Sequence, residues 1–446
     1  MAQDTTQYCI VIKSASGPIA LVRKDGRLQL PVVVLPDSAW PPDESAEING
    51  QLMDEHGLNC TLLCWLEKQQ DSNLILLEWH PGSAVPEVGV EWVDPFSDGI
   101  PLTPEHVPMV RRWLESSPDG LAPWEKPSWM QEVVIWLMGV FNGVDHPQLT
   151  NLAQIKAGWG MSTVLLIETT GADYYFKASN RQGIDEWRLT KVLHDRFPDR
   201  VPNPIRVDEQ RGWMITRAIE HTPLAPMDYH GLGETFRTYA DIQLGCGDLI
   251  ETGGAPGLRV RDANWLENNL DGFFCDHQGH EEYESIKSNL DTSQLAKLKK
   301  TWLQHIEALK MSTIPMGLVQ EDLHFDNILN TTNGPVIIDW ADCAMAHPLF
   351  SYHRILRLWG RELSDTDRLE RAHVTQAYLD AFSHLAEDKQ LHHEVELIRP
   401  LYRLYNAFHW QELALERGGR ANWGVRCSEN VMAFMQAAID EVGLPG

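Results

Sequence analysis

The chain carries two aspartates and an asparagine whose types and spacing suit phosphoryl transfer. Asn327 follows Asp322 by five residues, Asp339 lies twelve residues further on, and apolar segments flank them. Transfer from a magnesium nucleotide needs one carboxylate to receive the proton of the acceptor hydroxyl. It also needs an amide and a second carboxylate to hold Mg²⁺ against the phosphates. These three residues supply that set of side chains.

A hairpin is expected to bring the three side chains together. The apolar runs at residues 328–329 and 336–338 predict two strands, and the polar residues 330–334 predict the turn between them. Such a hairpin would direct Asn327 and Asp339 towards one ion from opposite sides.

The segments at 322–329 and 338–340 read D-L-H-F-D-N-I-L and I-D-W. They resemble the D-L-H-x-x-N-I-L … I-D-W pattern of the aminoglycoside phosphotransferase family, which is related to choline kinases and more distantly to protein kinases. The resemblance covers roughly residues 150–446. It implies an α+β, two-lobed, protein-kinase-like fold that uses ATP and Mg²⁺.

The resemblance also implies roles for individual residues. Asp322 matches the catalytic base, Asn327 and Asp339 match the metal ligands, and His324 matches an inner histidine of structural importance. The family usually has His-Gly before the catalytic aspartate, and this chain has Gln320 and Glu321 there. That difference concerns the packing of the loop.

Upstream, residues 152–169 predict two strands joined by a glycine turn, with Gly158, Gly160 and Ser162 at the turn. Backbone without bulky side chains can approach phosphates and offer N–H donors. A third strand carries Lys177, and a helix nine residues later carries Glu186. A kinase needs one cation on the phosphates and one helix carboxylate to hold that cation.

The helix offers a second carboxylate, Asp185, as a rival to Glu186. Residues 202–208 and 212–219 resemble the last two strands of the smaller lobe in this family. The chain after them would form the hinge between the lobes. On that resemblance, backbone groups of Arg217 and Ile219 are candidates for binding adenine.

Residues 1–116 resemble the Nudix hydrolase fold. The order of predicted elements is strands, a helix at 43–58 that stops at Gly57, and further strands. The motif is incomplete, because Gly50 and Gln51 stand where that family has an Arg-Glu pair, and only Asp54 and Glu55 remain near it. We expect an α/β domain without hydrolase activity.

The remaining organisation follows from composition and periodicity. Residues 117–145 read as a Pro- and Gly-rich linker followed by a docking helix, 146–220 as the smaller kinase-like lobe and 221–446 as the helical lobe. In the helical lobe, residues 248–264 read as a surface loop. Candidates for acceptor binding there combine aromatic rings with polar groups: Trp340, Asp342, His409, Trp410, Glu412 and Trp423.

The composition of the whole chain limits the classes of molecule that it can bind. Its 446 residues carry a formal charge of −26, which disfavours nucleic acid and suits a neutral or cationic acceptor. No signal peptide is visible at the N-terminus, and no apolar run approaches the ~20 residues of a membrane helix. The seven cysteines are expected to be reduced thiols of a cytoplasmic protein.

The sequence favours a small-molecule kinase acting on a hydroxylated acceptor. Two other readings remain open at this point. One is a pseudokinase that binds a nucleotide or a partner, and the other is a Nudix-type pyrophosphatase with an accessory kinase-like domain.

Overall fold

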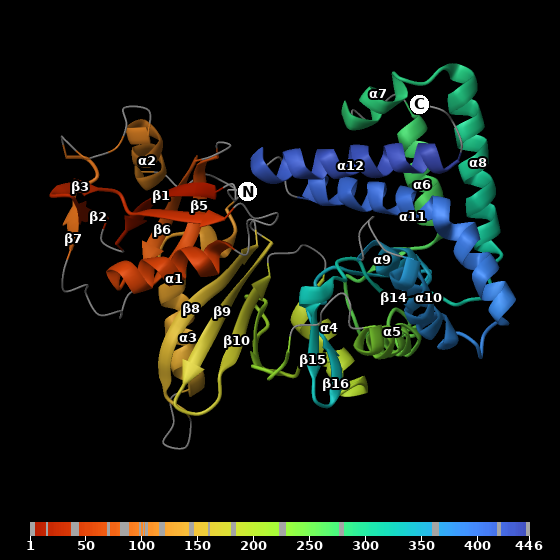
Figure 1. Cartoon of the computed structure of the whole chain (residues 1–446), viewed down its shortest axis with the longest axis horizontal. Helices are drawn as coiled ribbons and strands as arrows, with labels where there is room; N and C mark the ends of the chain where they lie inside the picture. The colour runs from red at the N-terminus through yellow and green to blue at the C-terminus, as the bar shows by residue number, and fades with distance from the viewer. Residues whose placement is uncertain are drawn as a thin grey trace. The chain divides into compact units, whose positions relative to one another are not determined.

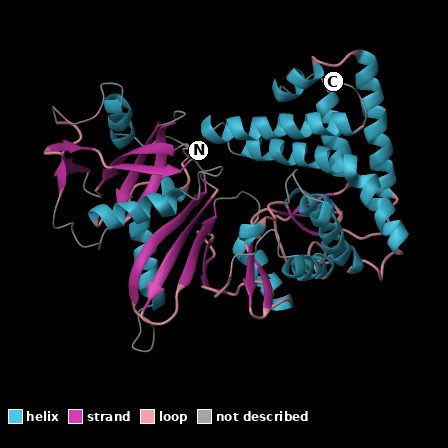
Figure 2. Ribbon diagram, viewed as in Figure 1, coloured by secondary structure: helices cyan, strands magenta, loops and turns pink. Residues whose placement is uncertain are grey.

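The computed structural model divides the chain into two compact units, which are described separately. Unit 1 comprises Met1–Arg181 and Pro204–Ala218, and unit 2 comprises Gln182–Asn203 and Ile219–Gly446. Unit 1 consists mainly of strands, and unit 2 mainly of helices (Figure 2). The structure describes residues 5–14, 17–36, 44–68, 72–80, 89–97, 100, 102, 106–115, 121–141, 147–158, 161–179, 184–222, 229–275, 281–358, 365–416 and 421–442.

Unit 1 begins with a mixed sheet in which β1 pairs with β2, β4 and β6, and β5 forms one edge beyond β6 (Figure 1). Pro31 lies between β3 and β4 and divides the apolar run there. Gly57 has a φ of 66° and follows the last residue of α1, as the sequence predicts. The elements of this N-terminal module are β1 (Thr5–Lys13), β2 (Ile19–Lys24), β3 (Arg27–Gln29), β4 (Val32–Pro36), α1 (Glu44–His56), β5 (Cys60–Lys68), β6 (Ser72–Trp79), β7 (Val90–Val93) and α2 (His106–Glu115).

A second sheet in unit 1 has the order β11-β12-β10-β9-β8, with β8 and β11 at its edges. One face packs against α3 through interlocked aromatic rings, among them Trp129, Phe176 and Trp213. Ala122 and Trp124 are buried in the same core, so this part of the expected linker is packed rather than exposed. The elements are η2 (Pro123–Glu125), α3 (Trp129–Phe141), β8 (Leu149–Gly158), β9 (Ser162–Thr169), β10 (Tyr174–Ser179), β11 (Pro204–Asp208) and β12 (Trp213–Arg217).

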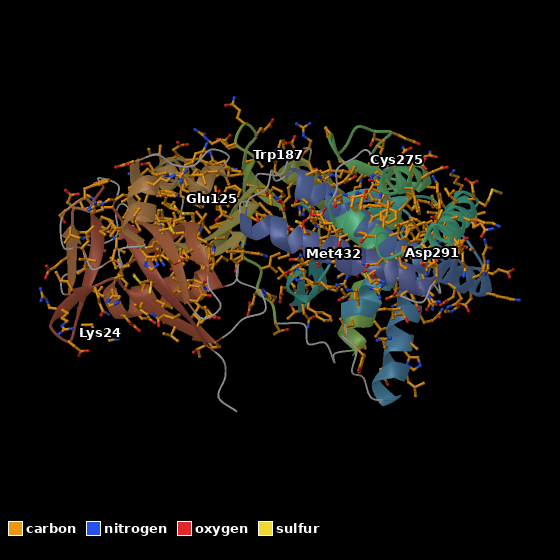
Figure 3. All side chains as sticks on the ribbon, turned by 90° about the horizontal axis from the view of Figure 1, so that it is seen from above. Lys24, Glu125, Trp187, Cys275, Asp291 and Met432 are labelled. Atoms are coloured by element: carbon orange, nitrogen blue, oxygen red, sulfur yellow. The ribbon has the colours of Figure 1, made fainter. Side chains whose placement is uncertain are left out.

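Unit 2 is built around one large apolar core to which nearly every helix contributes. A capping box starts α8: Asp291, labelled in Figure 3, accepts a hydrogen bond from the backbone N–H of Gln294 at the first turn of that helix. Helices α11 and α12 pack along one another (Figure 1). The helices are α4 (Glu186–Arg196), α5 (Tyr229–Leu244), α6 (Ala263–Phe274), α7 (Glu281–Lys287), α8 (Thr292–Lys310), α9 (Phe350–Leu358), α10 (Asp365–Asp380), α11 (Asp388–Glu416) and α12 (Ala421–Glu441).

Short strands carry the motif region of unit 2. Parallel β13 (Arg259–Arg261) and antiparallel β14 (Gly317–Gln320) both pair with β17 (Cys343–Ala346). The short helix η3 (Phe325–Asn327) leads into the hairpin of β15 (Ile328–Thr331) and β16 (Gly334–Ile337). Strand β13 lies within residues 248–264, so the expectation of a surface loop is wrong for its last part.

Candidate active site

The expected hairpin is present, and its register places the motif residues at one end. Ile328 pairs with Ile337, and the backbone N–H of Ile338 donates to the carbonyl of Asn327 at 3.0 Å. The turn is tighter than the sequence analysis proposed, because Thr331 pairs with Gly334 and only two residues connect the strands. Gly334 has a φ of 99°, which favours glycine there. The hairpin therefore brings Asn327 next to the segment that leads to Asp339.

The carboxylate of Asp322 is half-exposed and contacts two basic side chains. Nη2 of Arg354, from α9, lies 3.2 Å from Oδ1, and Nε2 of His324 lies 3.6 Å from Oδ2. Nε of Arg354 also donates to the carbonyl of Leu323 at 2.9 Å. Partial burial favours a higher pKa for Asp322, but the His324 hydrogen bond and the Arg354 charge lower the pKa below its usual value. The group is thus held in its ionised form.

Gln320 fixes the backbone before Asp339. Its Nε2 donates to the carbonyls of Ile338 at 2.8 Å and Asp339 at 2.6 Å, while its own backbone N–H donates to the hydroxyl of Tyr239 at 2.9 Å. Asp339 has a φ of 62°, in the left-handed region that non-glycine residues rarely adopt. Such strain persists where surrounding contacts enforce it, and it often accompanies functional residues.

The donor set of the motif suits magnesium. Nδ2 of the buried Asn327 donates to the carbonyl of Asp322 at 2.9 Å, which leaves its amide oxygen as the atom suited to a cation. With the carboxylate of Asp339, this gives hard oxygen donors, and Mg²⁺ commonly takes its other ligands from phosphates and water. Within the described ranges, no three His, Cys, Asp or Glu side chains gather to hold a metal by themselves.

Glu321, which directly precedes Asp322, belongs to a buried ionic cluster that the sequence analysis did not anticipate. Its Oε1 accepts hydrogen bonds from Nη1 of Arg261 and from the hydroxyl of Tyr405. Arg261 is 1% exposed, and its Nη2 donates to Glu412 at 2.7 Å. Burial alone would lower the pKa of Arg261, but Glu321, Tyr405 and Glu412 raise it above its ordinary value.

Several residues that the sequence suggests for acceptor binding belong instead to this cluster or to the core. Nη1 of Arg261 donates to Nδ1 of His409 at 2.7 Å, so His409 and Glu412 anchor α11 to β13. The side chain of Trp340 is fully buried and donates to the carbonyl of Ile337 at 3.0 Å, as a core residue does. Asp342 is buried as well, and Trp410 packs at the margin of the core. The side chain of Trp423 lies outside the described residues.

In unit 1, the register of the second sheet aligns the expected nucleotide residues. Ser162 pairs with Gly158 on one side and with Ser179 on the other, and Lys177 pairs with Val164 and Met214. Phe176 faces the aromatic core with α3, so strand alternation places Lys177 on the opposite face. Gly160 lies outside the described residues. Arg217 ends β12 with an exposed side chain.

Two expected nucleotide residues belong to unit 2. Glu186 is the first residue of α4 and is buried, whereas its rival Asp185 is half-exposed and lies 3.8 Å from Nε of Arg188. Burial therefore favours Glu186 as the residue with an interior role. The carbonyl of Ile219 accepts a hydrogen bond from Nδ1 of His221 at 2.8 Å, which leaves its N–H as the group to consider for adenine.

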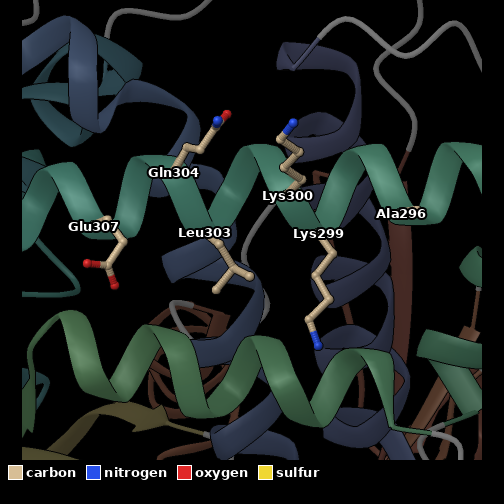
Figure 4. Close-up of a pocket in the computed structure, with 6 residues that line it drawn as sticks. All are labelled: Ala296, Lys299, Lys300, Leu303, Gln304 and Glu307. Atoms are coloured by element: carbon tan, nitrogen blue, oxygen red, sulfur yellow. The ribbon is translucent and has the colours of Figure 1, made fainter.

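A surface hollow of about 630 Å³ lies elsewhere, along α8 (Figure 4). None of the motif residues lines it, and Lys299 on its wall already contacts Asp271 at 3.0 Å. Its lining residues are Ala296, Lys299, Lys300, Leu303, Gln304 and Glu307. The hollow is therefore separate from the motif.

The sequence matches a known family over residues 151–387, the phosphotransferase enzyme family. It matches no curated protein. Among the helices that the structure describes, each is too short or too polar to cross a lipid bilayer.

Solved structures also resemble the chain. An aminoglycoside phosphotransferase in complex with GDP and kanamycin is 15% identical, with a TM-score of 0.46 over 69% of this chain and 99% of that one. A spectinomycin phosphotransferase with ADP and spectinomycin is 15% identical, with a TM-score of 0.44 over 70% and 98%. The choline kinase LicA from Streptococcus pneumoniae is 13% identical, with a TM-score of 0.43 over 69% and 99%.

Proposed function

Because the chain belongs to the phosphotransferase enzyme family, we propose that it transfers the γ-phosphate of ATP to a hydroxyl group of a small molecule. The observation that carries the proposal is the geometry of the motif in unit 2. There, an ionised Asp322, the amide of Asn327 and the strained Asp339 lie within one short hairpin region.

Asp322 acts as the base in this proposal. Arg354 and His324 hold its carboxylate in place and ionised, so it can accept a hydrogen bond from the acceptor hydroxyl and then its proton. The oxygen of that hydroxyl forms a bond to the γ-phosphorus as the bond from phosphorus to the β-phosphate oxygen breaks. The products are ADP and a phosphorylated acceptor.

Asn327 and Asp339 would hold Mg²⁺, which when bound neutralises charge on the nucleotide phosphates. Lys177 would contact the phosphates, and Glu186 would orient that lysine. Gly158, Gly160 and Ser162 would supply backbone donors, while Arg217 and Ile219 would offer backbone groups to the adenine. These roles follow from the motif positions in the sequence.

The two departures from the usual family motif are compatible with catalysis. Gln320 supports the backbone of Asp339, and the charge of Glu321 is balanced by that of Arg261. This supports an active enzyme over a protein that only binds nucleotide. We propose a neutral or cationic hydroxylated acceptor, because the chain has a formal charge of −26.

The N-terminal module is proposed to be a scaffold of Nudix-like type. Asp54, Glu55 and Glu47 on α1 are exposed, and Gly50 and Gln51 stand where the Nudix motif has its Arg-Glu pair. Nudix-type hydrolysis needs several carboxylates around Mg²⁺, so these residues do not favour a pyrophosphatase.

A screen of hydroxylated compounds for ADP release tests the proposed function. The full-length protein should release ADP with at least one acceptor, only when Mg²⁺ is present. The variant Asp339→Asn tests the metal site. It removes one proposed Mg²⁺ ligand and should abolish ADP release. ADP release that persists in Asp339→Asn would contradict the assigned metal site.

A further inference from the structure

Two sheet edges meet inside unit 1. Strand β5 is an edge of the N-terminal sheet, and β8 is an edge of the sheet that carries Lys177. Edge strands present unpaired N–H and C=O groups that need a partner. Here β5 and β8 do not pair with each other as strands, and side-chain amides connect them.

Asparagines of the N-terminal module cover the outer edge of β8. Nδ2 of Asn59 donates to the carbonyl of Leu152 at 2.7 Å, and Nδ2 of Asn49 on α1 donates to the carbonyl of Gln154 at 3.2 Å. The two carbonyls are two residues apart, so they lie on the same edge of the strand. The module thus satisfies two successive outward-facing carbonyls of β8.

Gln154 itself links the two sheets. Its Oε1 accepts a hydrogen bond from the backbone N–H of Leu62 in β5 at 2.8 Å, and its Nε2 donates to Oγ1 of Thr163 in β9 at 3.0 Å. The side chain is 1% exposed. Thr163 Oγ1 continues the chain of hydrogen bonds by donating to the carbonyl of Lys156 at 3.1 Å.

This link ends at the hairpin that carries the glycine turn. Thr163 directly follows Ser162, which pairs with Gly158. Gln154 pairs with Leu165, which lies on the α3 face of the sheet, while Lys177 lies on the other face. The N-terminal module therefore contacts the β8–β9 hairpin from its edge and leaves the Lys177 face uncovered by this link.

We propose that the N-terminal module positions the nucleotide-binding hairpin, and that Gln154 is the positioning residue through which it does so. The inference rests on the proposed function. Since buried polar groups are costly when unpaired, loss of the Gln154 amide would leave the N–H of Leu62 and the hydroxyl of Thr163 without these partners. The hairpin would relax, and the phosphate-binding backbone would lose its fixed position.

The test compares the full-length wild type with Gln154→Met, which keeps the side-chain length and removes both hydrogen bonds. We expect ATP to bind about tenfold more weakly, as measured by titration calorimetry, with KM for ATP raised to match. Turnover at saturating ATP should change by less than about twofold, because Asp322 and its neighbours are untouched.

The matched control is Glu394→Met. Glu394 is buried in unit 2 and also makes side-chain contacts, accepting a hydrogen bond from the hydroxyl of Ser312 and lying 3.4 Å from Nε2 of His347. Glu394→Met should lower the melting temperature about as much as Gln154→Met does, without weakening ATP binding. If both variants weaken ATP binding equally, the effect is general destabilisation and the inference is wrong.

Two further outcomes are decisive. If wild type binds ATP and Gln154→Met binds it equally well, the positioning role fails while the proposed function stands. If wild type binds no nucleotide, the proposed function fails and the inference fails with it. Should Gln154→Met not fold, Asn49→Ala and Asn59→Ala decide the matter, since each should weaken ATP binding about threefold.

Discussion

The residues around Asp322 show how a local motif depends on distant side chains. The spacing of Asp322, Asn327 and Asp339 identifies the motif because all three lie within one short stretch of sequence. Arg354 lies 32 residues beyond Asp322, and Arg261 lies 60 residues before Glu321. Sequence spacing alone does not reveal such contacts, because they depend on tertiary packing. Arg261 ends the three-residue strand β13, and its neighbours in sequence do not indicate that it is buried in an ionic cluster.

Arg354 should matter for turnover. Replacement by methionine, Arg354→Met, removes the charged partner of Asp322 and the donor to the carbonyl of Leu323. A hydrogen bond to a charged group is worth about 1.5–3 kcal/mol, so kcat should fall roughly 10- to 100-fold. Steady-state kinetics at saturating substrates measure this.

The control for that variant lies one turn along the same helix. Cζ of Arg357 lies 4.5 Å from the centroid of the Phe434 ring. Among the described hydrogen bonds, none joins Arg357 to Asp322. Arg357→Met should retain most of the wild-type kcat. Equal losses in both variants would show that α9 packing, rather than the contact to Asp322, sets the rate.

At the scale of elements, the ionic cluster around Arg261 joins β13, the end of β14 and α11. Arg261→Met would leave Glu321 buried without its cation. Breaking a buried ion pair from one side costs about 3–5 kcal/mol, so the free energy of unfolding should fall by that amount. Chemical denaturation of the full-length protein measures the change.

A double variant separates lost packing from an unpaired charge. Arg261→Met with Glu321→Leu removes both charges of the fully buried pair and leaves only the partly exposed Glu412, and replacing a buried pair by apolar groups is often close to neutral. The double variant should therefore regain at least about half of the stability lost by Arg261→Met. If the double variant is less stable than the single one, the cluster acts through shape rather than charge.

Elements with strong local signals could be predicted. The docking helix expected within residues 117–145 is present as α3, the glycine stop at Gly57 ends α1, and the two strands of the hairpin at 328–337 are confirmed. Strand β13 was missed because three residues give too little periodicity, and Gly- and Pro-rich neighbours suggest a loop. Its pairing partner β17 lies more than eighty residues away in sequence.

At the scale of the whole molecule, the two units combine segments that sequence order separates. Unit 1 takes in residues 204–218 after α4 has already entered unit 2. The expected borders near 116, 145 and 220 follow composition and resemblance, and they remain predictions. Burial of Trp124 and the amide links at β8 indicate that the N-terminal module and the second sheet share packing that composition could not reveal.

Each unit also contains a buried histidine that should make stability depend on pH. Burial lowers the pKa of His80 in unit 1 and of His353 in unit 2 to about 4. Both folded pKa values lie below the unfolded value of about 6.5, so the stabilising contribution is complete above pH 6.5 and is lost as pH falls towards 4. The loss is roughly 3 kcal/mol for each histidine.

His353→Asn should reduce this dependence in unit 2. Nε2 of His353 donates to the carbonyl of Val395 at 2.9 Å, and the variant removes the group that would have to charge. Urea denaturation at pH 7 and pH 4.5 should show a smaller difference for His353→Asn than for wild type. His373→Asn, at a 79% exposed side chain, should behave as wild type. Identical pH dependence in His353→Asn and wild type would contradict the assignment.

The most direct measurement is the effect of Asp322→Asn on turnover and on ATP binding in the same full-length protein. Once an acceptor has been identified, kcat should fall about 10²- to 10⁴-fold, while the ATP dissociation constant should stay within about twofold of wild type. Turnover that survives undiminished would contradict the role of Asp322 as the base.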